Sequence, residues 1–203
     1  MKRSERTELT VSKILEAALE EFGTNGYAGG TINSICKRGI NKGLIYHNFQ
    51  DKDELYLVCL ENSCQKLVTM IEENSCGCDQ LQYMKLRMRF FTECPHEAHI
   101  FFEAILQPQE KLRDRIQLIL QPFENINERI YRSVVSSITL RDGITEEDAI
   151  AYFRQMQRMF NGYYSSSAYR CTALDDQIRE HEMNLAKLLD FMLYGIAKGG
   201  TPT

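Results

Sequence analysis

Side chains that can recognise a nucleic acid are gathered in one short stretch of the chain, residues 41–52. Lys42 can bind a phosphate or a guanine edge, His47 can hydrogen-bond a base or a phosphate, and Tyr46 can donate to a phosphate oxygen. Lys52 begins a further helical pattern, where its ammonium group and the helix dipole would both meet a phosphate. These residue types predict binding to the backbone and base edges of DNA.

Two short helices must hold these side chains. Thr31 is a suitable N-cap for a first short helix, which Gly39 ends, and Asn41 is a suitable N-cap for a second one. A longer helix is predicted before them, over about residues 9–24, with Asn25-Gly26 as its stop signal. Two short helices joined by a glycine turn, after a longer packing helix, are typical of a helix-turn-helix.

The spacing within the second short helix indicates which side chains face outward. Ile45 and Phe49 are four residues apart, so they share one helical face and are predicted to face the core. Lys42, Tyr46 and His47 then point elsewhere, where a DNA groove could reach them.

The rest of the chain has a helical pattern too, without a sustained alternation that would indicate strands. The sequence therefore predicts an all-α fold of about nine or ten helices, with an N-terminal three-helix domain of helix-turn-helix type and a C-terminal helical bundle. We place a DNA-binding domain at residues 1–52 and a ligand-binding and dimerisation domain at 53–203, in which 53–73 form a connecting helix. A helix over about 109–139 is predicted to bend at Pro122.

Charge distribution agrees with a DNA-binding N-terminus on an acidic body. The 203 residues carry a formal net charge of −4, whereas residues 1–52 hold eight basic and six acidic side chains. No run of 18 apolar residues predicts a membrane helix, and the charged N-terminus lacks the apolar segment of a secretory signal. A cytoplasmic protein with no membrane partner is the expectation.

Cysteine and histidine spacing gives little support for a metal or a cofactor. The seven cysteines are odd in number and irregular in spacing, which favours reduced thiols; Cys76-Gly77-Cys78 is a close pair without zinc-ribbon spacing. A redox role for that pair stays a minor alternative. His96 and His99, with Cys94 and Glu103 nearby, could form a metal cluster, but they are more typical of the polar start of a helix. We predict no metal, no cofactor and, in the absence of a catalytic motif, no enzyme activity.

Residues 14–55 resemble the DNA-binding domain of the tetracycline-repressor (TetR) family. The matching residues are Ile14-Leu15-Glu16-Ala17-Ala18, Phe22, Asn25-Gly26-Tyr27, Thr31, Ile35, Gly39-Ile40-Asn41-Lys42-Gly43-Leu44-Ile45-Tyr46-His47-Asn48-Phe49 and Lys52-Asp53-Glu54-Leu55. The resemblance implies a transcriptional repressor that binds a palindromic double-stranded DNA operator as a homodimer and is released by a small-molecule effector. It also implies a role for each matched position. Base-facing positions would be Lys42, Gly43, Leu44 and His47, and backbone-facing positions would be Thr31, Asn41, Tyr46 and Lys52.

One departure from the family pattern concerns the turn. The family usually has one more small residue between Ile35 and Gly39, and a missing residue would rotate a continuing helix by about 100°. Because Ile45 and Phe49 keep their spacing, we predict that the two short helices still dock.

Aromatic, methionine and arginine side chains of the C-terminal part suggest an effector site among the helices near 80–93, 95–106 and 109–139, although core packing is the more frequent role for any single one of them. Arg87 could meet an effector carboxylate there. The candidates are Tyr83, Arg87, Phe90, Phe91, Phe102, Tyr131, Met156 and Phe160.

Broad apolar faces on the last two predicted helices suggest a two-fold interface, or else burial within one chain. The interface candidates are Tyr152, Met156, Met159, Tyr163, Leu185, Leu189 and Met192. The alternative to a repressor is a helical dimeric module that binds a small molecule or a protein and has lost DNA binding, which the acidic net charge and the shortened turn would favour.

Overall fold

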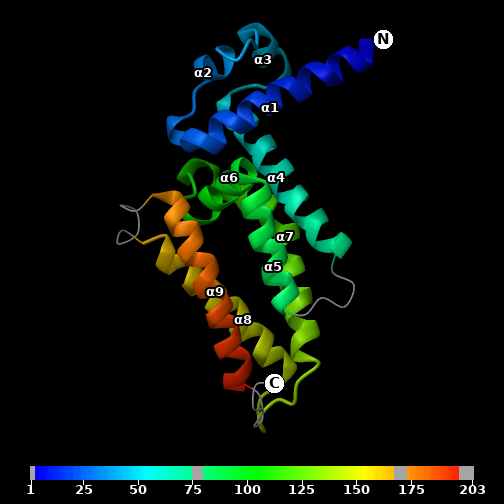
Figure 1. Ribbon diagram of the computed structural model, residues 1–203, viewed down its shortest axis with the longest axis vertical. Helices are drawn as coiled ribbons and strands as arrows, with labels where there is room; N and C mark the ends of the chain where they lie inside the picture. The colour runs from blue at the N-terminus through cyan, green and yellow to red at the C-terminus, as the bar shows by residue number, and fades with distance from the viewer. Residues whose placement is uncertain (1–2, 75–79, 167–172, 197–203) are drawn as a thin grey trace. The chain divides into compact units, whose positions relative to one another are not determined.

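The computed structural model describes residues 3–74, 80–166 and 173–196. Within these ranges the chain forms nine α-helices and one 3-10 helix and no β-strand, which confirms the all-α prediction (Figure 1). Cys76, Cys78 and Cys171 lie outside the described residues, so the redox alternative for the Cys76–Cys78 pair stays a prediction.

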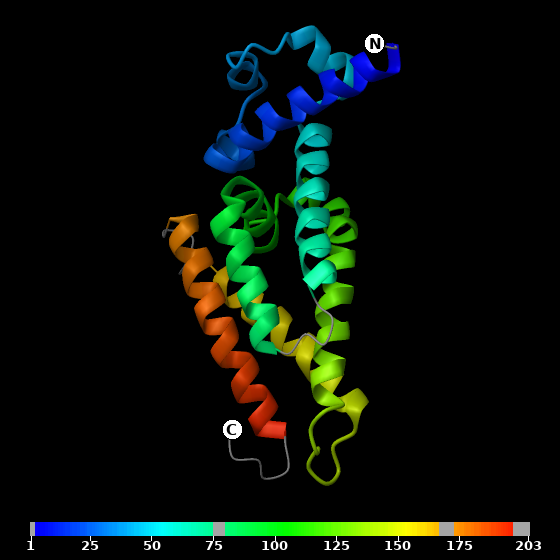
Figure 2. The same ribbon diagram turned by 45° about the vertical axis from the view of Figure 1, so that its right-hand side comes forward.

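Figures 1 and 2 show the helices from two sides. Their bounds are α1 Arg3–Gly29, α2 Ile32–Cys36, α3 Lys42–Asn48, α4 Lys52–Asn74, α5 Gln80–Glu93, α6 Pro95–Leu106, η1 Glu110–Leu112, α7 Arg113–Val135, α8 Glu146–Tyr164 and α9 Leu174–Ile196. No helix in the described ranges is both long enough and apolar enough to cross a membrane.

The chain divides into two compact units. The first unit comprises Met1–Leu67 and Phe90–Leu120, and the second comprises Val68–Arg89 and Gln121–Thr203. Both α4 and α7 contribute to each unit, so packing does not follow the order of the sequence. The functional boundary between residues 52 and 53 stays a prediction.

The core of the first unit is built on α1, whose apolar residues Ile14, Ala18 and Phe22 recur every four residues and are fully buried. This face contacts α2, α3 and, most extensively, α6. Phe22 packs edge-on against the Tyr56 ring of α4, with ring centroids 5.4 Å apart. Helix α1 therefore carries the two short helices on a rigid base.

The predicted end of α1 is only partly correct. Gly26 interrupts the helix with φ of 66°, but a further helical turn follows and ends at Gly29, and α1 starts at Arg3 rather than near residue 9. A positive φ is available to glycine without steric cost, which explains the interruption. The extra turn forms because Gly30 N–H bonds to the Gly26 carbonyl at 2.9 Å, a contact that the sequence pattern does not indicate.

In the second unit α8 and α9 pack against each other. Thr145 and Asp148 form a reciprocal capping box at the start of α8. Helix α7 is shorter than predicted: residues 110–112 form a separate 3-10 turn, and the helix ends at Val135. Pro122 lies inside it, and the bend expected there stays a prediction.

Candidate nucleic-acid interface

Helix α3 presents the predicted base-facing side chains to the outside. Ile45 is 1% exposed and fixes the inner face, whereas Tyr46 is 51% and Leu44 45% exposed. Lys42 and His47 are exposed as well. Docking on α1 and α2 therefore leaves a short helix with its polar side chains turned outward, which is the arrangement that a major groove requires.

The turn before α3 accommodates the missing residue. The Arg38 N–H bonds to the Ile35 carbonyl and the Gly39 N–H to the Cys36 carbonyl, both at 3.1 Å, so α2 tightens into i to i+3 bonds as it ends. Gly39 then reverses the chain with φ of 85°. Contacts of α3 with both α1 and α2 confirm the prediction that the short helices still dock.

Both predicted N-caps are formed. The Thr31 hydroxyl oxygen accepts a hydrogen bond from the Ser34 N–H at 3.0 Å at the start of α2. The Asn41 side-chain oxygen accepts one from the Gly43 N–H at 2.7 Å at the start of α3. Each cap satisfies a backbone donor that the helix leaves unpaired. A contact of either residue with a DNA backbone stays a prediction.

Lys52 has a structural role that the sequence did not indicate. Its ammonium group donates to the Tyr27 carbonyl at 2.7 Å and to the Gly30 carbonyl at 3.0 Å, and it lies over the Tyr27 ring. Burial lowers the pKa of Lys52. Two of its three donors thus hold the end of α1, which leaves at most one for a phosphate.

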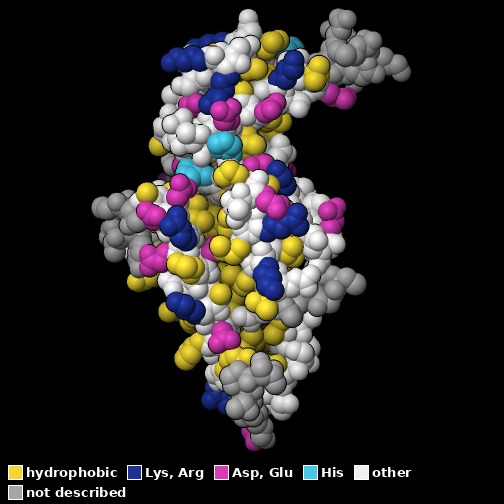
Figure 3. Space-filling view, in the orientation of Figure 1, with side chains coloured by type: hydrophobic (Ala, Val, Ile, Leu, Met, Phe, Trp, Pro, Cys, Tyr) yellow, Lys and Arg dark blue, Asp and Glu magenta, His cyan; other side chains and the backbone are white. Residues whose placement is uncertain are grey.

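Lys and Arg side chains gather over α2 and α3 on the face drawn in Figure 3. Lys37, Arg38 and Lys42, which lie on these helices or in the turn between them, are exposed. Arg38 forms ion pairs with Glu20 and Glu21 of α1, while the Lys42 ammonium group donates to the Asn33 side-chain oxygen at 3.2 Å. Lys37 and Lys42 are therefore the cations of this patch without an ion pair among the described residues.

A buried carboxylate on α6 holds the kink of α1, and the sequence analysis missed this role. Glu103 accepts the Tyr27 N–H at 2.8 and 3.0 Å with its two oxygens, and it accepts the Tyr56 hydroxyl at 3.1 Å. A side-chain carbon on Gly26 would lie 2.8 Å from a Glu103 oxygen, so this close approach requires glycine. Burial raises the pKa of Glu103, and the hydrogen bonds from Tyr27 and Tyr56 limit the rise.

A second contact fixes the same region from the start of α4. Asp53 accepts the Tyr27 hydroxyl at 2.5 Å and the Lys111 ammonium group at 2.6 Å. Burial alone would raise the pKa of Asp53, but these hydrogen bonds outweigh it and lower that pKa.

Glu103 stands out in the sequence as an acid within the apolar stretch of residues 100–106, a signal that points to a buried polar contact.

The candidate effector residues fall into both units. Phe90, Phe91 and Phe102 lie in the first unit, where the ring centroids of Phe91 and Phe102 are 4.6 Å apart. The others lie in the second unit. Among these, Phe160 and Met156 are half-buried, and Tyr131 stacks on Phe153 with ring centroids 4.0 Å apart. The set predicted as one pocket is therefore distributed over two packing units.

Tyr83 and Arg87 belong to a buried polar network in the second unit. The Arg87 guanidinium donates to both oxygens of Glu182 on α9, at 2.8 and 2.6 Å, and to the Tyr83 hydroxyl at 2.9 Å. Tyr83 in turn donates to the Asn127 side-chain oxygen. Burial alone would raise the pKa of Glu182, but the charge and hydrogen bonds of Arg87 hold it well below its usual range. The carboxylate that Arg87 meets is thus one of the chain's own.

The candidate interface residues separate by exposure. Tyr152, Met159 and Tyr163 of α8 are between 47% and 59% exposed, and Met156 is half-buried. In contrast, Leu185, Leu189 and Met192 of α9 lie in the core of the chain itself, because they share the inner face of that helix. The outward apolar side chains of α9, which the sequence analysis did not select, are Met183, Phe191 and Tyr194.

No group of three or more side chains of the types that bind metals comes together within the described part of the chain. Of the four residues considered for such a cluster, Cys94 is buried and Glu103 holds the backbone of Tyr27. The predicted absence of a metal site stays a prediction.

Comparison with known proteins agrees with this arrangement. Residues 14–59 match the family model of bacterial regulatory proteins of the tetR family. The HTH-type transcriptional repressor AcnR of Corynebacterium diphtheriae is 32% identical over 71 residues, which is 34% of this chain and 37% of that protein. The matched segment thus spans little more than a third of this curated relative.

Solved structures extend the likeness to the fold of almost the whole chain. FadR from Bacillus subtilis, in complex with stearoyl-CoA, has a TM-score of 0.64 at 18% identity and covers 91% of this chain and 98% of its own. SmeT, the repressor of the Stenotrophomonas maltophilia multidrug efflux pump SmeDEF, also has a TM-score of 0.64, at 21% identity, with coverage of 97% and 95%. Residues 14–59 thus agree with the tetR family of bacterial regulatory proteins, and the solved structures agree in fold with almost the whole chain.

Proposed function

We propose that the chain is a DNA-binding transcriptional regulator, a repressor that binds a palindromic operator as a homodimer and is released by a small-molecule effector. The observation that carries this proposal is the docked helix α3, capped by Asn41 and exposing Lys42, Leu44, Tyr46 and His47. The matched relative AcnR is named a transcriptional repressor, which supports repression rather than activation. A cytoplasmic location is part of the same proposal, because the operator is there.

Dimerisation is proposed through α8 and α9. Tyr152, Met159 and Tyr163 on α8, with Phe191 and Tyr194 on α9, expose large apolar surfaces that a second copy would cover. Hydrophobic side chains are visible along the face that carries α9 in Figure 3. A two-fold pairing of two helices from each copy gives a four-helix interface and sets the separation of the two DNA-binding helices.

The effector site is proposed in the second unit, around Tyr131, Asn127 and Tyr83. Within the described part of the chain, the Tyr131 hydroxyl and the Asn127 side-chain nitrogen are buried and have no hydrogen-bond partner. A buried donor without a partner costs free energy, and a ligand with a polar group would supply one. The stearoyl-CoA bound to FadR shows that a protein of this fold holds a small molecule.

The test is fluorescence anisotropy of the purified protein with DNA from upstream of its own gene, at two salt concentrations. We expect Lys42→Ala to weaken binding, by about 1–3 kcal/mol if Lys42 contacts a base edge, and to flatten the salt dependence if Lys42 contacts a phosphate. The two salt concentrations therefore separate these two roles. Tyr46→Ala should also weaken binding. Both side chains are exposed, so the free energy of unfolding should stay nearly unchanged.

A matched control is Lys85→Ala, which removes an exposed lysine of α5, a helix outside the proposed DNA and dimer surfaces, and should leave DNA affinity intact. Equal affinity of the wild type, Lys42→Ala and Tyr46→Ala would contradict the assignment of α3 as the recognition helix. Absence of saturable binding by a folded dimer would favour the second candidate, a dimeric binding module without DNA. The observation that favours this second candidate is the acidic net charge of −4.

A further inference from the structure

Two buried hydrogen-bond donors without a partner lie on one face of α7 in the second unit. Among the described residues, the Tyr131 hydroxyl and the Asn127 side-chain nitrogen are buried and have no hydrogen-bond partner. The two residues are four positions apart, so they lie one helical turn from each other on the same side of the helix. Each is only 4% exposed. Neighbouring groups that the chain leaves unsatisfied favour a bound molecule that completes their hydrogen bonds.

The hydrogen bonds around Asn127 show that a ligand must supply an acceptor. The Tyr83 hydroxyl oxygen accepts a hydrogen bond from Arg87, and its proton is donated to the Asn127 side-chain oxygen. The nitrogen is therefore the end of the Asn127 amide that stays open, and it can only donate. Burial raises the pKa of Tyr131 to about 12, so its hydroxyl also keeps a proton to donate. A ligand ammonium group has no acceptor for Asn127, whereas a carbonyl oxygen has two lone pairs and can accept from both donors.

The charged side chains in the interior of this unit are already paired. The Arg87 guanidinium donates to both oxygens of Glu182, and the His181 ring nitrogen lies 3.0 Å from the same carboxylate. In the described part of the second unit, these three are the only buried side chains of the Lys, Arg, His, Asp or Glu types. A charged ligand would lose its hydration without gaining a free counter-charge, so an uncharged ligand is favoured.

Aromatic rings lie beside both donors. Tyr131 stacks on Phe153 of α8 with an interplanar angle of 11°. One turn before Asn127, Phe123 is buried on the same face of α7, and the Arg87 guanidinium lies 5.1 Å from its ring centroid. Flat apolar rings next to hydrogen-bond donors favour a planar aromatic ligand that carries a few polar atoms.

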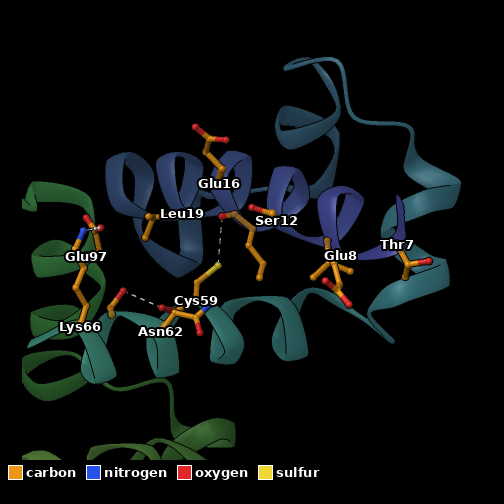
Figure 4. A pocket seen from close by; sticks show the side chains of 12 residues that line it. Thr7, Glu8, Ser12, Glu16, Leu19, Cys59, Asn62, Lys66 and Glu97 are labelled. Atoms are coloured by element: carbon orange, nitrogen blue, oxygen red, sulfur yellow. Dashed lines mark hydrogen bonds and ion pairs between the residues drawn. The ribbon is translucent and has the colours of Figure 1, made fainter. Parts of the chain in front are cut away.

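The first unit contains a groove that lacks this signal. The groove measures about 560 Å³ and lies between α1 and α4 (Figure 4). On its floor the Ser63 hydroxyl donates to the Cys59 carbonyl at 2.8 Å, and the Cys59 thiol donates to the Leu15 carbonyl. None of the described residues that line the groove has a buried side-chain nitrogen or oxygen without a partner. Open space does not indicate the chemistry of a ligand, whereas the unpaired donors of α7 do.

We propose that the effector site of the second unit takes an uncharged aromatic molecule whose carbonyl-type oxygen accepts hydrogen bonds from the Tyr131 hydroxyl and the Asn127 side-chain nitrogen. This inference rests on the effector site proposed above and names the class of ligand for it. The class excludes carboxylates and ammonium compounds, although Arg87 and Glu182 lie in the same unit, because each of these charges already has its partner.

The test compares three planar probes of similar size, acetophenone, α-methylstyrene and benzoate, by isothermal titration calorimetry of the full-length protein. α-Methylstyrene has a methylene group in place of the carbonyl oxygen of acetophenone, and benzoate adds a negative charge. Tyr131→Phe should lower the affinity for acetophenone about two- to tenfold, the loss of one hydrogen bond, and leave that for α-methylstyrene unchanged. Benzoate should bind most weakly. An equal response of acetophenone and α-methylstyrene to Tyr131→Phe, or tightest binding of benzoate, would overturn the proposal.

The melting temperature without ligand gives a second readout. Tyr131→Phe removes an unpaired buried hydroxyl and should raise the melting temperature by about 2–4 °C. The matched control is Tyr164→Phe, because the Tyr164 hydroxyl donates to the Glu180 carbonyl and accepts from the Asn184 side chain at 2.8 Å. This variant should lower the melting temperature and leave acetophenone affinity unchanged. A lower melting temperature of Tyr131→Phe would show that its hydroxyl is paired in the free protein, which would overturn the proposal.

The anisotropy titration with DNA separates the ligand class from the effector function. Tyr131-dependent binding of acetophenone that also releases DNA is the expected result. Tyr131-dependent binding without release would support the ligand class and contradict the effector function. Release by acetophenone that is equally strong in Tyr131→Phe would overturn the ligand class and leave the effector function intact. If none of the three probes binds at millimolar concentration, the ligand class and the site in the second unit are both overturned.

Discussion

Polar side chains serve opposite purposes in the helix-turn-helix segment (residues 31–49) and in the second unit. In the helix-turn-helix segment they bond to near neighbours in sequence, such as Asn41 to Gly43, and they remain exposed. In the second unit Arg87 and Glu182 are 95 residues apart, lie within hydrogen-bond distance and are both almost fully buried. An exposed polar group keeps its water or exchanges it for DNA, whereas a buried charge depends on the partners that the chain itself supplies.

This difference explains what each region can do. The exposed donors of α3 are fixed in place by caps and by the buried Ile45, so they are available for an external partner. The charge of Arg87 is already neutralised by Glu182, so an effector in this unit would find neutral groups such as the Tyr131 hydroxyl rather than a free cation. The comparison also predicts that substitutions in the two regions affect different measurements.

The largest effect is expected at the buried ion pair. Arg87→Met should lower the free energy of unfolding by about 3–5 kcal/mol, because Glu182 would keep a buried charge without its partner. Urea unfolding followed by circular dichroism measures this. DNA affinity of the fraction that remains folded should change little, since the ion pair and α3 belong to different packing units.

The control is the double variant Arg87→Met with Glu182→Met. It removes both charges and should recover most of the lost free energy of unfolding, because apolar side chains of similar volume often replace a buried pair at no cost. A double variant that is no more stable than Arg87→Met alone would show that packing of the two long side chains, rather than charge pairing, stabilises the contact between α5 and α9.

An intermediate effect is expected at Glu103, where the first unit has its own buried carboxylate. Glu103→Ala leaves the Tyr27 N–H and the Tyr56 hydroxyl without their acceptor and should cost about 1–3 kcal/mol in the free energy of unfolding. Amide hydrogen exchange should show the loss directly as faster exchange at Tyr27. Glu103→Gln keeps an acceptor oxygen for Tyr27 and should protect that amide almost as well as the wild type. Equal exchange rates in the wild type and Glu103→Ala would contradict the proposed clamp on α1.

Local signals in the sequence predicted the helix-turn-helix segment in detail, and long-range contacts explain what they missed. The caps at Thr31 and Asn41 and the break at Gly39 each depend on residues two to four positions away. The local sequence is therefore enough to predict these three features. Lys52 looked like a phosphate ligand because the sequence does not show that the Tyr27 and Gly30 carbonyls come within its reach.

The same reasoning applies to the apolar faces of the second unit. Periodicity marked α9 as amphipathic, but it did not distinguish the side that packs inside the chain, with Leu185, Leu189 and Met192, from the side that exposes Phe191 and Tyr194. Nor could any spacing rule pair Arg87 with Glu182, because the loops between them and the packing of α5 on α9 decide that contact. Sequence patterns indicate which residues are apolar, and tertiary packing decides what covers them.

The smallest effect separates two roles of one residue, Asn41. As an N-cap of α3 it should contribute about 1 kcal/mol to the free energy of unfolding, which Asn41→Ala would remove. Asn41→Asp should keep that contribution, because a carboxylate accepts the Gly43 N–H equally well and suits the positive end of the helix dipole. The same negative charge would repel a DNA phosphate. Asn41→Asp should therefore melt like the wild type and bind DNA more weakly in the anisotropy titration. Binding equal to that of the wild type would mean that Asn41 acts on α3 alone and that the backbone contacts of this interface lie elsewhere.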